Sequence, residues 1–202
     1  MESKNYLNDL SEIKDLMSRS SRFLSLSGLS GILAGLYALI GAGIAYVYLL
    51  PAEGESLRTH STSFSLLVAL LLGIAFLSIV TAIGLSYRKA KKNGENIWDA
   101  TTTRLLINFA VPLLTGGIYI LIKIQSDHFG LTGALMLIFY GLALVNASKY
   151  TLGQVRYLGY IEIVLGLFCA AFPGHGFWFW TLGFGVMHIL YGGLMYQKER
   201  QG

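Results

Sequence analysis

The stretch LGYIEIVLGLFCAAF, residues 158–172, decides how this chain folds. It runs for fifteen residues with a single charged side chain, Glu162. About 20 apolar residues are needed for a helix to cross the hydrocarbon core of a bilayer, and apolar residues continue on both sides of this stretch. The stretch therefore predicts a membrane helix, and it raises the question of why such a helix holds a carboxylate.

The whole chain has the composition of a membrane protein. Of its 202 residues, 54% are hydrophobic and 13% are charged, whereas a soluble domain carries about 25% charged residues. Long apolar runs occur at 23–50, 64–87, 105–124, 129–148, 152–172 and 176–196, and none has the alternation of a membrane β-strand. We predict an all-α polytopic membrane protein, with six transmembrane helices in three hairpins over residues 23–196.

The N-terminal segment, residues 1–22, has a separate pattern. One helix face in heptad spacing is formed by Tyr6, Leu10, Ile13, Met17, Ser20 and Leu24. The segment is too long and too mixed in charge for the start of a signal peptide, so we predict an amphipathic cytoplasmic helix. Residues 6–24 lie on the lipid surface, pack onto the protein's own cytoplasmic loops, or pack against a partner, which is a second copy or another membrane protein.

Basic residues are distributed unevenly between the two sides of the predicted bundle. Of the 15 lysines and arginines, all but Arg58 and Lys123 flank the same side. The positive-inside rule then places both termini, including the tail 197–202, in the cytoplasm. The net charge of +4 follows from this topology, so membrane lipids are predicted partners and nucleic acid is not.

Small residues recur at helical spacing within the apolar runs. They form small-xxx-small ridges that let helix backbones approach closely, and they comprise Ser27, Gly31, Gly35, Gly159, Gly166, Gly185 and Gly192. This pattern predicts tight helix packing and no chemistry.

Glu162 and His188 lie on the two sides of a tight turn, PGHG, at residues 173–176. Both are about 13 residues from the centre of this turn, so they fall at nearly the same depth. Each shares a helix face with small residues, and a charge at mid-membrane is costly without a partner. We predict a buried polar cluster of Glu162 and His188, to which similar depth or the same face adds Tyr140, Thr115 and Tyr191.

Enzyme motifs are weak in this sequence. GLSG at 28–31 resembles the segment around the rhomboid protease nucleophile, but it lies in the first apolar run instead of the fourth. No HExxH, Walker A or paired-cysteine motif occurs, and Cys169 is expected to be a packing residue. We predict no enzyme and no cofactor. A zinc site formed by His60, His128 and His175 on the outer side remains an alternative.

The last predicted hairpin, GYIEIVLGLFCAAFPG followed by LGFGVMHILYGGL, resembles the HdeD-like (DUF308-type) six-span bacterial inner-membrane proteins. The resemblance lies in the spacing of Gly159, Gly166, Pro173, Gly183 and Gly192. It implies a bacterial inner-membrane protein linked to stress or acid tolerance, without catalytic residues. MSRSSRFLSLSGLSGILAGLYAL, residues 17–39, also resembles the start of small bacterial membrane proteins without a known activity.

Two functions remain open at this point. The first is a non-enzymatic integral inner-membrane protein, stress-related or regulatory, which acts by helix–helix assembly and uses Glu162 and His188 to fix helix register. The alternative is a small proton- or ion-coupled transporter or channel that uses the same pair.

Overall fold

The computed structural model describes residues 25–50, 61–94, 99–151 and 153–201. These residues form helices and no strand. In chain order the elements are α2 (Gly28–Ile44), η1 (Ala45–Leu49), α3 (Thr62–Lys92), α4 (Ala100–Gln125), α5 (Thr132–Ala147), α6 (Val155–Ala171), α7 (Gly176–Trp180), η2 (Thr181–Met187) and α8 (His188–Gln201). The predicted amphipathic helix at 1–22 lies outside the described residues.

Among the described residues, four helical segments are long and apolar enough to cross a membrane: Gly28–Leu49, Thr62–Lys92, Ala100–Gln125 and Gly176–Gln201. Their length and composition indicate a membrane-embedded protein. The predicted spans 129–148 and 152–172 correspond to shorter helices, because α5 has 16 residues and α6 has 17. The chain turns before α5 with Asp127 at a positive φ of 57°, and turn residues likewise separate α5 from α6.

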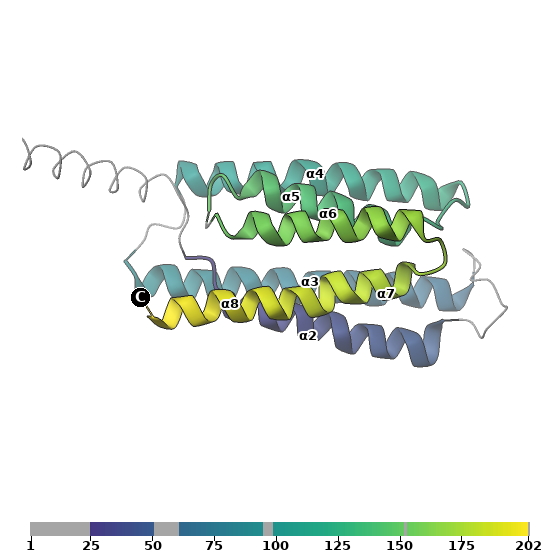
Figure 1. Cartoon of the computed structure of the whole chain (residues 1–202), viewed down its shortest axis with the longest axis horizontal. Helices are drawn as coiled ribbons and strands as arrows, with labels where there is room; N and C mark the ends of the chain where they lie inside the picture. Colours follow the sequence, from purple (N-terminus) through teal and green to yellow (C-terminus); the bar gives the residue numbers. More distant parts are fainter. Residues whose placement is uncertain (1–24, 51–60, 95–98, 152, 202) are drawn as a thin grey trace, which may run out of the picture.

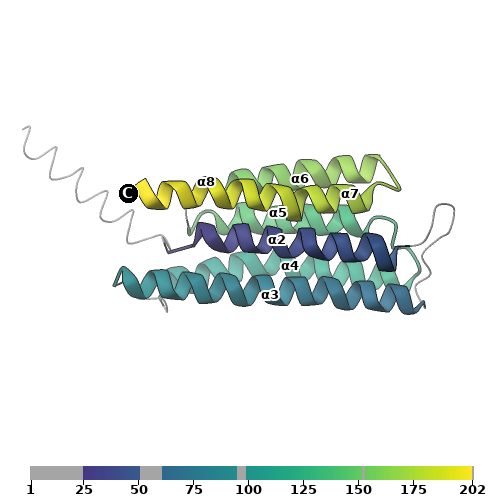
Figure 2. The ribbon, with the colours of Figure 1, turned by 90° about the horizontal axis from the view of Figure 1, so that it is seen from below.

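The helices run side by side along the long axis of the molecule (Figures 1 and 2). In the centre, α5 packs against α6, and α2 packs against η2 and α8. Two long helices flank this centre: α3 packs against α2, and α4 packs against α5. The most apolar part of α3 contains no buried residue, so most of its surface faces outward.

Helix polarity divides the molecule into two ends. The last turn of α3 carries Lys89, Lys91 and Lys92, and the last turn of α8 carries Lys198 and Arg200. Both turns lie at the same end of the molecule, whereas α4 finishes at the other end (Figure 1). We call the end that carries these five residues the basic end.

Glycines set the closest approaches between helices. A Cβ atom added to Gly192 of α8 would lie 2.5 Å from the backbone nitrogen of Ile32 and 2.8 Å from the carbonyl oxygen of Gly28, both in the α2 region. A Cβ added to Gly159 of α6 would lie 2.7 Å from the carbonyl oxygen of Gly141 in α5. At these distances the backbones would have to separate, so the two central helix pairs depend on the missing side chains.

Candidate functional site: a buried carboxyl group between α5, α6 and α8

Glu162 lies in the middle of α6 and is completely buried, with 0% of its surface exposed. The helix turns its carboxyl group inward together with Gly159, Gly166 and Cys169, which are also buried. Neither carboxyl oxygen makes a hydrogen bond within the described part of the chain. This is unusual, because nearly all buried polar side-chain atoms in native proteins are hydrogen-bonded.

His188 is an ionisable neighbour of Glu162. Its Nδ1 atom lies 3.5 Å from Oε1 of Glu162, which is within ion-pair distance, but the two atoms are not hydrogen-bonded. The ring is engaged elsewhere: Nδ1 lies 3.0 Å from the carbonyl oxygen of Gly183, and Nε2 lies 2.8 Å from the hydroxyl oxygen of Tyr140. The imidazole therefore links α5 to the backbone of η2, with the carboxyl group of α6 beside it.

The hydrogen-bond partners determine how the neutral ring is protonated. A carbonyl oxygen accepts and cannot donate, so Nδ1 carries the hydrogen and donates it to Gly183. Nε2 is then the acceptor, and Tyr140 donates its O–H to it. Nδ1 is also 3.5 Å from Oε1 of Glu162, so a proton that leaves the ring toward Glu162 has to turn away from the carbonyl of Gly183.

The π-helical turn η2 brings its backbone against the carboxyl group. A Cβ atom added to Gly183 would lie 2.5 Å from Oε2 of Glu162 and 2.5 Å from Cδ2 of Leu137. Glycine is therefore needed at this position for the carboxyl group to fit. π-helical turns are frequent at functional sites, and this one carries the carbonyl group that orients His188.

Two layers of apolar side chains enclose the carboxyl group. Toward the end opposite the basic end, buried Ala134, Leu137 and Cys169 pack with Leu165, Ala170, Phe179 and Phe184. Toward the basic end, buried Leu144, Val155 and Leu158 pack with Leu26, Phe109, Tyr140, Met187 and Tyr191. We call these the outer layer and the inner layer, and Glu162 lies between them in the α6 sequence.

Four of the five residues predicted for the polar cluster lie in this region. Tyr140 contacts His188 directly, and Tyr191 packs in the inner layer, where its hydroxyl makes no hydrogen bond to a described residue. Thr115 is a correction: it is exposed, and its hydroxyl donates to the carbonyl of Val111 in its own helix. The adjacent Gly116 faces Phe139 of α5, so Thr115 points away from the bundle although its depth is similar.

Six of the seven small residues predicted for helix packing lie at helix–helix contacts, and Ser27 does not. Gly31, Gly35, Gly185 and Gly192 lie where α2 meets η2 and α8, while Gly159 and Gly166 lie where α6 meets α5. Ser27 precedes the first residue of α2, and its carbonyl accepts a hydrogen bond of 2.6 Å from the hydroxyl of Ser30. The close contact belongs to Gly28 instead, whose added Cβ would lie 2.8 Å from the carbonyl of Gly192.

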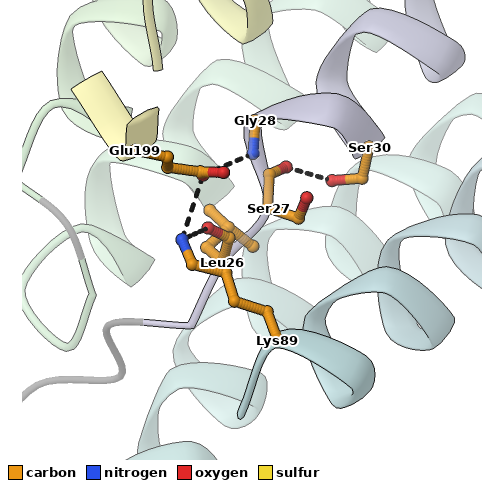
Figure 3. Close-up of polar contacts among 6 residues, drawn as sticks. All are labelled: Leu26, Ser27, Gly28, Ser30, Lys89 and Glu199. Carbon is orange, nitrogen blue, oxygen red and sulfur yellow. Dashed lines mark hydrogen bonds and ion pairs between the residues drawn. The ribbon is translucent and has the colours of Figure 1, made fainter. Parts of the chain in front are cut away.

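A second polar cluster at the basic end was missed by the sequence analysis (Figure 3). Oε1 of Glu199, in the last turns of α8, accepts a hydrogen bond of 2.7 Å from the backbone nitrogen of Gly28 and lies 3.0 Å from Nζ of Lys89. Nζ of Lys89 also donates to the carbonyl of Leu26 at 2.9 Å. We call Glu199, Lys89, Gly28 and Leu26 the clasp, since they join the start of α2 to the ends of α3 and α8.

No metal site is visible in the described residues. They contain no group of three or more histidine, cysteine, aspartate or glutamate side chains that could hold a metal ion. Nδ1 of exposed His128 lies 2.5 Å from the carbonyl of Ser126, and Nδ1 of exposed His175 lies 3.3 Å from the carbonyl of Pro173. His60, the third histidine of the zinc alternative, is outside the described residues.

No family model, curated protein or solved structure matches the chain. The fold and the site therefore define a class only: a helical, membrane-embedded protein with a buried carboxyl–imidazole–phenol cluster.

Proposed function

We propose that this protein is a small proton-coupled transporter or channel in which Glu162 binds and releases a proton. The observation that carries the proposal is the fully buried carboxyl group of Glu162, which makes no hydrogen bond within the described chain although His188 is 3.5 Å away. A pair that served only to fix helix register would be expected to satisfy both oxygens, because a half-satisfied buried network is destabilising. Protons move along hydrogen bonds, and Nδ1 of His188 needs only a small approach from 3.5 Å to form one with Oε1 of Glu162.

The neighbouring groups supply a route for that proton. The hydroxyl of Tyr140 donates to Nε2 of His188, and Nδ1 faces Oε1 of Glu162. When Nδ1 passes its proton to the carboxylate, Nε2 takes the proton of Tyr140, and the phenol is restored by the next donor. Imidazole suits this role because it exchanges protons near neutral pH.

The proposal includes the membrane arrangement. We propose six spans, with α5 and α6 completing the four long apolar segments, and a basic end that faces the cytoplasm of a bacterial inner membrane, as the positive-inside rule requires. Both termini are then cytoplasmic. The resemblance to HdeD-like proteins fits this location, and it suggests a link to acid stress.

Proton flux in proteoliposomes tests the function. We expect wild-type vesicles to show flux above that of protein-free vesicles, and we expect Glu162→Gln and His188→Ala to abolish it while both variants remain folded. Tyr160→Phe is the matched control, because Tyr160 is an exposed residue of the same helix, and it should keep full flux. Wild-type flux at the background level, or unchanged flux in folded Glu162→Gln, would reject the proposal.

Assembly remains the second candidate function, and the outer surface favours it. The most apolar part of α3 has no buried residue, and Cβ atoms added to Gly73 and Gly84 would meet nothing within 4 Å. Small residues on an open helix face suit a close contact with another helix. A detergent-solubilised mass that matches one chain would count against assembly by self-association.

A further inference from the structure

The proposed proton site has different surroundings toward its two ends. The outer layer is built from aliphatic and aromatic side chains, with the thiol of Cys169 as its one titratable group. The inner layer contains two phenols, Tyr140 and Tyr191. A proton needs groups that can both donate and accept, and a phenol can do this whereas an aliphatic side chain cannot.

Tyr191 is placed to be the next member of the chain. It follows His188 by three residues in α8, so it shares the same helix face about 4.5 Å nearer the basic end. Its ring packs in the inner layer with Tyr140, and its hydroxyl is buried without a hydrogen bond to a described residue. A buried hydroxyl in this state is open to a hydrogen bond with a neighbouring proton donor or acceptor.

The outer layer, on the opposite side of Glu162, contains no phenol and no imidazole. The indole nitrogen of Trp180 is buried without a hydrogen bond, but an indole N–H donates and cannot accept, so it cannot relay a proton. The hydroxyl of Thr181 is already bonded to the carbonyl of Phe177 at 2.8 Å. Among the described residues, the titratable groups of this region are therefore His188 and Tyr140 at the site, Tyr191 in the inner layer, and the thiol of Cys169, a weak donor and acceptor, in the outer layer.

We infer that protons reach Glu162 from the basic end through Tyr191, and that the outer layer closes the site to the other end in this conformation. This inference rests on the proposed function. In each transfer, a hydronium ion at the basic end gives a proton to the hydroxyl oxygen of Tyr191 and becomes water, and Tyr191 passes its own proton to Tyr140. The phenol of Tyr140 passes its proton to Nε2 of His188, and Nδ1 passes its proton to Oε1 of Glu162. The carboxylate becomes a carboxylic acid, and no tyrosinate remains. His188 is left with its hydrogen on Nε2, so the ring has to return to the Nδ1–H tautomer before the next transfer.

A pH jump followed by infrared spectroscopy tests the route. In nanodiscs, the carboxylic acid band that is lost in Glu162→Gln reports the protonation of Glu162. We expect Tyr191→Phe, which keeps the ring in the inner layer, to slow the appearance of this band at least tenfold and to leave its final amplitude unchanged. Tyr160→Phe, the exposed control on α6, should match the wild type.

Oriented proteoliposomes give a second measurement that needs no variant. Vesicles are selected by the accessibility of the C-terminal tail to protease, and acid is added to the outside. Fast protonation is expected when the basic end faces outward and slow protonation when it faces inward. Equal rates from both sides, or a wild-type rate in Tyr191→Phe, would overturn the inference alone, whereas the absence of any band specific to Glu162 would overturn the proposed function with it.

Discussion

The clasp should contribute measurably to stability, and Glu199 is the residue at which to test it. Its carboxylate accepts from the backbone nitrogen of Gly28 at 2.7 Å and pairs with Lys89 at 3.0 Å. A hydrogen bond to a charged group contributes about 1.5–3 kcal/mol. The ion pair is partly exposed, at 24% and 18% for its two side chains, so it adds about 0.5–1 kcal/mol.

These contributions overlap, because one carboxylate makes both contacts at the positive end of the α2 dipole. We therefore expect Glu199→Ala to lower the free energy of unfolding by about 2–3 kcal/mol. Glu199→Gln keeps an acceptor for Gly28 and loses the charge, so its effect should be about 1 kcal/mol. The matched control is Gln197→Ala, an exposed position two residues earlier in α8, which should change stability by less than about 0.5 kcal/mol.

Reversible unfolding in mixed detergent micelles, followed by circular dichroism, measures these differences. A double-mutant cycle with Lys89→Met separates the ion pair from the hydrogen bond to Gly28. If Glu199→Ala unfolds at the same detergent fraction as Gln197→Ala, the clasp does not hold α2, α3 and α8 together and the reasoning is wrong.

Three further predictions follow from helix packing and topology. Gly192→Ala should destabilise the protein by about 1–3 kcal/mol, because the new Cβ would meet the α2 backbone. The adjacent Gly193→Ala is the control: its new Cβ meets nothing within 4 Å, so it should be neutral or stabilise by up to about 1 kcal/mol. Equal unfolding midpoints for the two variants would contradict this prediction. Thr115→Val should leave proton flux at the wild-type level, since Thr115 is exposed. Loss of flux in the folded variant would show that Thr115 belongs to the proton site. Reporter fusions after residue 202 and within 88–104 should read cytoplasmic, and a fusion within 53–62 should read external; an odd number of crossings would exclude six spans.

The sequence was enough to predict that Glu162 and His188 lie at the same level along the helix axes. Counting from the turn at 173–176 brought Glu162 and His188 to the same level, and the structure puts their side chains 3.5 Å apart. The count works because a helix rises by a constant amount per residue. The same count fails for Thr115, since depth does not determine which way a side chain faces on a helix that is apolar all round.

Contacts between distant segments were harder to predict. Glu199 lies among Lys198 and Arg200 in a short polar tail, where nothing in the local pattern indicates that its partner is 171 positions away. The packing of α5 on α6 and of α2 on η2 and α8 joins helices that the hairpin prediction did not pair. Glycine spacing identifies a face for close contact but leaves the partner helix open, because any small face fits any other.

The shortness of α5 and α6 has a consequence for the surrounding lipid. With 16 and 17 residues, these helices rise about 24–26 Å, less than the hydrocarbon thickness of about 30 Å, while the flanking α3 with 31 residues exceeds it. A bilayer responds to such hydrophobic mismatch by thinning beside the short helices and by tilting the long ones. In the proposed six-span arrangement, such thinning brings headgroups and water closer to the carboxyl group of Glu162, so we expect acyl-chain length to affect its proposed proton exchange.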